Sequence, residues 1–215
     1  MTDLASARNA LVAMAAIIEN FSINEVVRSY QDTLERYVTS AANGNMTATA
    51  IRLIMKQLIG FSAKDVYIEG LREGGIKDPQ LGDDDKAAID EWVSGQVDHV
   101  KDFADACVLV AELKGDEKTS ARDRMMDRVG LWVTALSNLG NLAALRAKGD
   151  PYLTYDGDDG EESCVDCQKY KGQRRKLSWW KKHGLTDRPN TNYECGRYQH
   201  CHHHFYNDDG EMVID

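Results

Sequence analysis

Apolar side chains recur at steps of three and four throughout the first 150 residues. This periodicity is the strongest constraint on the fold, and it favours helices. In residues 4–21 it places Leu4 and Leu11 on one stripe, the pattern of an amphipathic helix with one face in a core. Ser22 and Glu25 have the spacing of a capping box. We therefore expect helices over residues 4–21, 22–44, 51–59, 62–74, 84–113 and 119–148, with a loop at 76–84.

Local signals refine these boundaries. Ser62 and Asp65 suggest a helix cap, so the sequence predicts that a separate short helix begins there and ends at Gly74. The loop at Gly115 is short, which predicts that the two long helices on either side pack antiparallel. Gly130 and Gly140 lie inside the last of these helices and are expected to weaken or bend it.

The composition excludes several classes of protein. The chain has 215 residues, of which 42% are apolar, enough for a core and against wholesale disorder. A net charge of −9 argues against general electrostatic binding to nucleic acid. No stretch has the ~18 uncharged apolar residues of a membrane span, so we expect no membrane partner. Because Asp3 comes early and no basic segment precedes an apolar run, we expect no secretory signal.

Several residues of the helical region are best explained by packing alone. Cys107 falls on an apolar stripe and is expected to be a buried small hydrophobe. Trp92 and Trp132 are predicted core residues, and His99 is predicted to lie at or near the surface.

The sequence changes character at Asp150. Residues 150–163 are acidic and rich in turn formers, and we expect a linker or an irregular extended segment there. Four of the five cysteines follow within a short distance, together with several histidines. The sequence predicts a mainly α protein with an antiparallel helical body over residues 1–149. A small, irregular, zinc-knuckle-like C-terminal module is expected over residues 150–215.

The spacing of these cysteines is typical of a metal site. Cys164 and Cys167 form a C-x-x-C pair that can face one tetrahedral ion, and Cys195 and Cys201 form a second pair, followed by His202, His203 and His204. A structural Zn²⁺ needs four such ligands. We expect Cys164, Cys167 and Cys195 as ligands, with either Cys201 or His203 as the fourth. Two disulfides, or free thiols, are the alternatives.

A basic run lies between the two cysteine pairs. It contains eight Lys and Arg residues, from Lys169 to Arg188, opposed only by Asp187, and it includes Trp179 and Trp180. We favour a solvated face whose tryptophans pack over the module or against the helices. Contact with an acidic protein surface is a second interpretation. Nucleic-acid binding through residues 169–188 is a third.

The tail carries a longer motif around the two cysteine pairs. Its residues are Cys164-x-x-Cys167, Lys171-Gly172-Gln173, a tryptophan, His183-Gly184-Leu185, Pro189, Cys195-Gly196, Cys201 and His203. This motif resembles the C-terminal motif of tailed-phage minor head proteins, the head-morphogenesis proteins related to the phage Mu F protein. The resemblance covers residues 150–206 and extends weakly to Arg122-Asp123-Arg124-Met125. It departs at the knuckle, where His203 stands in place of an expected second cysteine.

The resemblance implies a non-enzymatic structural protein of a phage virion, made in the host cytoplasm. Its partners would be capsid, portal or neck proteins in an oligomeric assembly. The helices would form the interaction surface, and a zinc knuckle would stiffen the tail. Two alternatives compete with this reading: an HNH-type nuclease, using His183 and the histidines at 200–204, and a regulatory DNA-binding protein with a zinc module.

Overall fold

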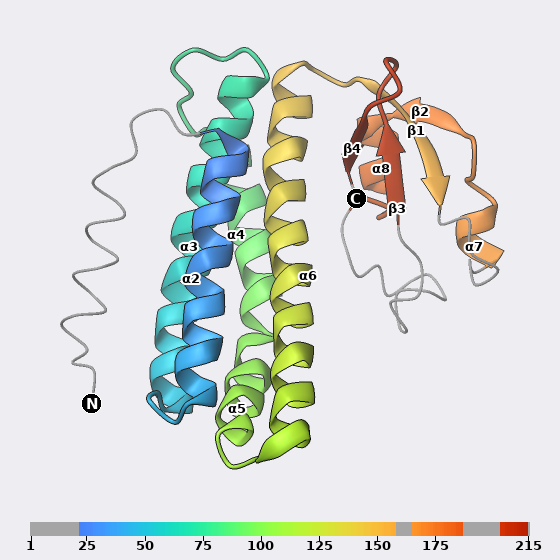
Figure 1. Cartoon of the computed structure of the whole chain (residues 1–215). Helices are drawn as coiled ribbons and strands as arrows, with labels where there is room; N and C mark the ends of the chain where they lie inside the picture. Colours follow the sequence, from blue (N-terminus) through green and yellow to red (C-terminus); the bar gives the residue numbers. More distant parts are fainter. Residues whose placement is uncertain (1–21, 158–164, 187–202, 215) are drawn as a thin grey trace.

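The computed structural model of the chain describes residues 22–157, 165–186 and 203–214. The helix predicted over residues 4–21 lies outside these ranges. Within them, the protein is mainly helical, with a small antiparallel sheet near the C-terminus (Figure 1). The long helices are α2 (Ile23–Ala42), α3 (Ala48–Glu73), α4 (Asp83–Val97), α5 (Val100–Val110) and α6 (Gly115–Ala147). They run up and down beside one another, and α4 and α5 follow each other in the same direction as one side of the bundle.

The predicted start of the second helix is confirmed. The Ser22 hydroxyl accepts a hydrogen bond from the Glu25 backbone N–H, and the Glu25 carboxylate accepts one from the Ser22 backbone N–H at 2.7 Å. These bonds satisfy N–H groups that have no partner inside the helix. The helix ends just before Gly44, whose φ of 75° lies in the left-handed region that glycine tolerates best.

The predicted cap at Ser62 is wrong. Helix α3 runs without a break through Ser62, which is buried on the inner face of the helix. Its real cap is Thr47, whose side chain accepts a hydrogen bond from the Ala50 N–H. The apolar stripe continues from Met55 to Val66, and burying it in one continuous helix outweighs the local cap signal at Ser62.

The helix predicted over residues 84–113 is instead two helices. Helix α4 ends at Val97 and α5 begins at Val100. Ser94 and Gly95, both poor helix formers, precede the break. Helix α4 packs mainly on α3 and fully buries only Ile89, whereas α5 contacts both α2 and α3. The break therefore lets the lower half of this segment enter the core of the bundle.

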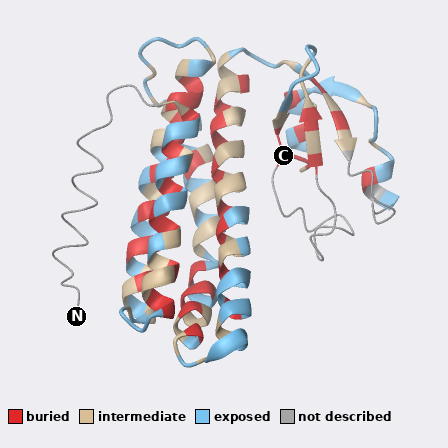
Figure 2. Cartoon of the chain, in the orientation of Figure 1, coloured by how far each residue is buried: buried red, intermediate tan, exposed pale blue. Residues whose placement is uncertain are grey.

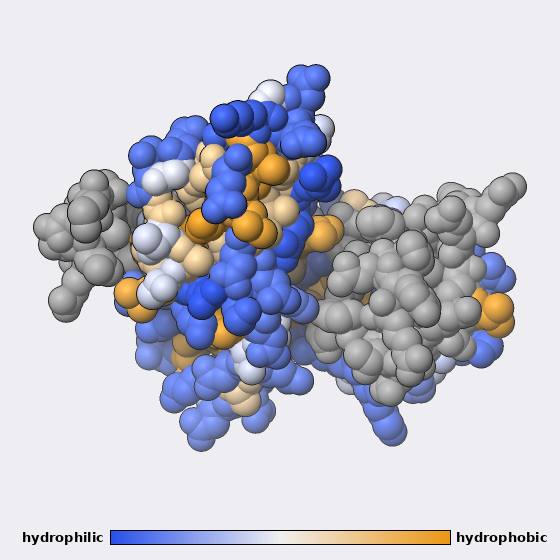
Figure 3. All heavy atoms as spheres, turned by 90° about the horizontal axis from the view of Figure 1, so that it is seen from below, coloured by the Kyte–Doolittle hydropathy of each residue, from blue (hydrophilic) through white to orange (hydrophobic). Residues whose placement is uncertain are grey.

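One apolar core fills the inside of the bundle, and buried residues line the inward sides of the helices (Figure 2). Phe103 and Trp132 pack against each other within it, with ring centroids 4.7 Å apart. Trp132 is buried as predicted, whereas Trp92 is only half-buried at the edge of the core. Viewed from below, the body carries hydrophilic side chains over much of its surface, with smaller hydrophobic patches between them (Figure 3).

The described helices include none that is long and apolar enough to cross a membrane.

Helices α3 and α6 cross unusually closely because glycine stands at the contact. A Cβ added to Gly70 would lie 2.1 Å from the Gly140 carbonyl oxygen, and one added to Gly140 would lie 2.8 Å from a methyl group of Val66. The sequence predicted that Gly130 and Gly140 would weaken or bend α6. The helix continues through both positions, and at Gly140 the missing side chain lets the two backbones approach.

Cys107 is buried in this core, as predicted, with 1% of its surface exposed. Burial disfavours the charged thiolate and raises the pKa of this thiol to about 12. We therefore expect Cys107 to stay unlabelled by a thiol reagent at about pH 8 while the protein is folded. Wild type and the Cys107→Ala variant should show the same number of fast-reacting thiols. Loss of one fast-reacting thiol in the variant would contradict this burial.

The C-terminal part is not irregular, as the sequence suggested, but contains a sheet of order β2-β1-β3-β4 with antiparallel pairing. The segment predicted as a linker supplies β1, an inner strand, because Leu153 and Tyr155 alternate into a core and are fully buried. The elements are β1 (Tyr152–Gly157), α7 (Val165–Gln168), β2 (Arg174–Lys176), α8 (Leu177–Lys182), β3 (His203–Tyr206) and β4 (Met212–Ile214).

A second apolar core holds this module together and attaches it to the end of α6. Trp180 is fully buried at its centre, and its indole N–H is 3.1 Å from the carbonyl oxygens of both Leu153 and Arg175. Leu145 of α6 is part of the same core, so the module packs directly on the body. The other members are Tyr155, Cys167, Leu177, Leu185, Phe205 and Ile214.

Candidate metal centre

Two of the predicted metal ligands meet inside the C-terminal module. The sulfur of Cys167, on the short helix α7, lies 3.3 Å from Nε2 of His203, the first residue of β3. Both side chains are buried, with 1% and 5% of their surfaces exposed. The contact joins residues that are 36 positions apart in the chain.

The sheet and the segment around α7 bring these residues together. Strand β1 pairs with β3 so that Gly157 is opposite His203. The chain after α7 returns to the other edge of β1, where the Gly172 N–H donates to the Tyr155 carbonyl at 2.8 Å. Tyr155 also packs edge-on against the His203 ring, with centroids 5.7 Å apart. Strand β1 therefore positions both the segment that carries Cys167 and the strand that carries His203.

A backbone carbonyl determines the tautomer of the neutral His203 ring. Nδ1 of His203 lies 3.0 Å from the carbonyl oxygen of Leu185. Because a carbonyl oxygen can only accept a hydrogen bond, we assign the proton to Nδ1. Nε2 then presents its lone pair towards the Cys167 sulfur. Metal-binding histidines commonly have a partner of this kind on the nitrogen that does not bind the ion.

The geometry of the pair fits a tetrahedral zinc ion. Zinc–sulfur and zinc–nitrogen bonds of about 2.3 and 2.0–2.1 Å, at the tetrahedral angle, place the two ligand atoms about 3.5 Å apart. The observed separation of 3.3 Å is close to this value. Without a metal, the same two atoms would form a hydrogen bond between a thiol and a neutral imidazole, so the buried pair is compatible with either state.

The remaining predicted ligands lie outside the described residues. They are Cys164, Cys195 and Cys201, together with His202. His204 belongs to the described part but lies near Met212, with Nδ1 3.2 Å from the sulfur. This is expected because alternate residues of a strand face opposite sides. Within the described residues no group of three or more His, Cys, Asp or Glu side chains could hold a metal ion.

The sequence singled out Cys167 and His203, which the structure places in contact, but it did not point to Leu185. The contribution of Leu185 is a backbone carbonyl, which any residue could supply, so no sequence signal marks it. Its side chain is buried in the core of the module, and this packing fixes the position of the carbonyl.

The basic run between the cysteine pairs divides into residues with and without acidic partners. Arg174 forms two hydrogen bonds to Asp208, at 2.6 and 2.8 Å, which lower the pKa of that carboxyl. Hydrogen bonds from the backbone N–H and the hydroxyl of Ser178 lower the pKa of Asp150, which lies 3.9 Å from Lys176. Part of the run is therefore neutralised within the module. Arg188 lies outside the described residues.

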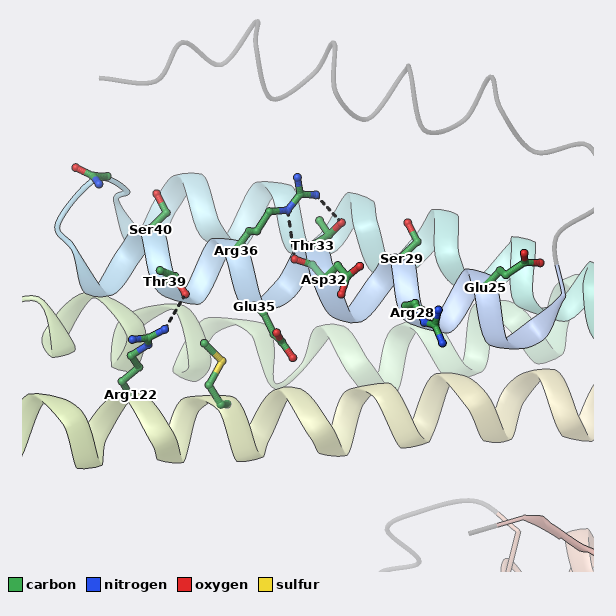
Figure 4. Close-up of a pocket in the computed structure, with 12 residues that line it drawn as sticks. Glu25, Arg28, Ser29, Asp32, Thr33, Glu35, Arg36, Thr39, Ser40 and Arg122 are labelled. Atoms are coloured by element: carbon green, nitrogen blue, oxygen red, sulfur yellow. Dashed lines mark hydrogen bonds between the residues drawn. The ribbon is translucent and has the colours of Figure 1, made fainter.

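An open groove on the body, which sequence reasoning missed, runs along the outer side of α2 towards α6 (Figure 4). Arg122 of α6 reaches across it and donates to the Thr39 hydroxyl at 3.5 Å. Arg36 is held locally by the Asp32 carbonyl and the Thr33 hydroxyl. Acidic and basic side chains line the groove in equal numbers, so it offers no field of one sign for a charged ligand.

No protein-family model matches this sequence, and neither a curated protein nor a solved structure has a significant match to it. The resemblance to phage head-morphogenesis proteins therefore remains a prediction from the sequence motif.

Proposed function

We propose that the C-terminal module is held by a structural zinc ion and that the chain is a non-enzymatic structural protein of a tailed-phage head. The observation that supports the zinc site best is the buried contact between Cys167 and His203. The proposed ligands are Cys164, Cys167, Cys195 and His203, and Cys201 is not required in this set. Through its coordination bonds, zinc would connect the segment around α7 to strand β3.

The virion role is proposed from the tail motif, whose C-x-x-C and His203 contribute the two residues that meet in the module. In this proposal the module is a stiff element attached to the end of α6, and the surface of the helical body contacts capsid, portal or neck proteins. The apolar contact between Leu145 and the core of the module would hold the module in a fixed position relative to the bundle.

The virion role predicts that this chain is present in mature particles. We expect quantitative mass spectrometry of density-purified particles to detect it at a fixed ratio to the major shell protein. A near-equal ratio would indicate a protein that decorates or cements the shell, and a dozen or so copies would indicate a portal or neck component. Absence of the chain from the particles would refute the virion role, while the zinc site would be tested separately.

A further inference from the structure

The module carries a group of cations that form no ion pair with an acidic side chain of its described residues. Arg175, Lys181 and Lys182 are exposed, and no acidic side chain of the described residues forms an ion pair with them. Arg174 and Lys176, their neighbours in the basic run, do have acidic partners. The net charge of the chain is −9, so these three cations lie on a protein whose overall charge is negative.

A column of flat side chains lies beside these cations. The rings of Trp179 and His183 stack with centroids 3.7 Å apart and planes at 19°. The Arg175 guanidinium lies 5.7 Å from the centroid of the Trp179 ring. Trp179 and His183 are both partly exposed, and Arg175 is exposed. Cation–π and stacking contacts of this kind also stabilise a nucleobase placed on the end of such a column.

The column is fixed before any ligand binds. Trp179 packs at 90° against the buried ring of Trp180, with centroids 4.9 Å apart, and this contact ties the column to the core of the module. Nδ1 of His183 lies 2.8 Å from the Trp179 carbonyl oxygen, which orients the imidazole. Because these side chains are already ordered, a ligand that stacks on them loses less conformational entropy on binding.

We propose that the column of Arg175, Trp179 and His183, with Lys181 and Lys182, binds single-stranded nucleic acid. The three cations would contact phosphates, and an unpaired base would stack on the column. An acidic protein surface would satisfy the charges but would make no use of the partly exposed rings of Trp179 and His183, so the combination favours a nucleic acid. This inference goes beyond the proposed virion role, and neither depends on the other.

The test is fluorescence anisotropy of the full-length protein with a labelled oligothymidylate of about 15 nucleotides, over a range of salt concentrations. If the three cations each contact a phosphate, the logarithm of the binding constant should fall with the logarithm of salt concentration with a slope of about −2. In the triple variant Arg175→Gln, Lys181→Gln, Lys182→Gln, the slope should approach zero and affinity at ~50 mM salt should fall by about tenfold or more.

A second variant separates stacking from charge. Trp179→Leu should weaken binding by roughly fivefold or more, because a stacked base is lost, with little change in the salt slope. The matched control is Lys56→Gln, Lys64→Gln, Lys77→Gln, which removes the same charge from exposed positions on the body. It should bind as tightly as wild type and with the same slope.

Three outcomes would overturn the proposal. The first is no binding by wild type at ~50 mM salt. The second is an equal loss of affinity in the body control and the module variant, which would show an effect of net charge alone. The third is displacement of the oligonucleotide by poly-glutamate as effectively as by unlabelled oligonucleotide, which would favour an acidic protein partner. Circular dichroism of each variant checks that the fold is retained.

Discussion

Replacing His203 with alanine is expected, under the zinc proposal, to release the ion and unfold the C-terminal module, while the helical body stays folded. A structural zinc ion contributes about 10–16 kcal/mol in small metal-held modules, which is more than the small core around Trp180 is expected to replace. The body has a separate apolar core, so its helical signal in circular dichroism should persist. Zinc content per chain and the fluorescence of the module tryptophans give the two readouts.

Two further variants make this prediction specific. His203→Cys should retain zinc, because a thiolate can replace an imidazole as a tetrahedral ligand. Cys201→Ser should also retain zinc, because Cys201 is not among the proposed ligands. Retention of zinc and of the module fold in His203→Ala would contradict the assignment of His203. Loss of zinc in Cys201→Ser would show that Cys201 binds the ion.

Replacing Gly70 with alanine will destabilise the helical body by about 1–3 kcal/mol or more. The new methyl group would lie 2.1 Å from the Gly140 carbonyl oxygen and 2.8 Å from the Ala143 methyl group. Neither neighbour is the flexible end of a long side chain, so α3 and α6 would have to move apart along their contact. Urea unfolding followed by circular dichroism measures the loss of stability.

Gly60 provides the matched control in the same helix. A Cβ at this position would have no neighbour within 4 Å, and alanine favours a helix over glycine by ~1 kcal/mol. Gly60→Ala should therefore leave stability unchanged or raise it. Equal effects of the two substitutions would mean that helix propensity, and not the close approach of α3 and α6, governs both positions.

The helices of the body could be predicted from sequence because their apolar periodicity extends over many turns. The errors occurred where tertiary packing overrode a local signal. Ser62 has the side chain of a helix cap, yet its position on the inner face of α3 placed it in the core. The break between Val97 and Val100 depends on which neighbours α4 and α5 contact, and a single stripe of apolar residues does not specify this.

The sheet of the module was missed because its strands are short and polar at their ends. In β1 only Leu153 and Tyr155 mark the inward face, and two alternating residues beside an acidic, turn-rich segment look like a linker. The candidate metal ligands stood out more clearly in the sequence, because cysteines and histidines are clustered at the spacing typical of a metal site. The contact between Cys167 and His203 agrees with that prediction, whereas the carbonyl of Leu185 could be found only in the fold.

The most direct test of the zinc assignment is native mass spectrometry of the full-length protein, purified without chelator or added metal. We expect a mass that exceeds that of the metal-free chain by about one zinc ion. Treatment with a chelator should remove this excess, and the module should unfold at the same time. A metal-free chain, lighter by the hydrogens lost in forming disulfides between the clustered cysteines, would contradict the zinc site.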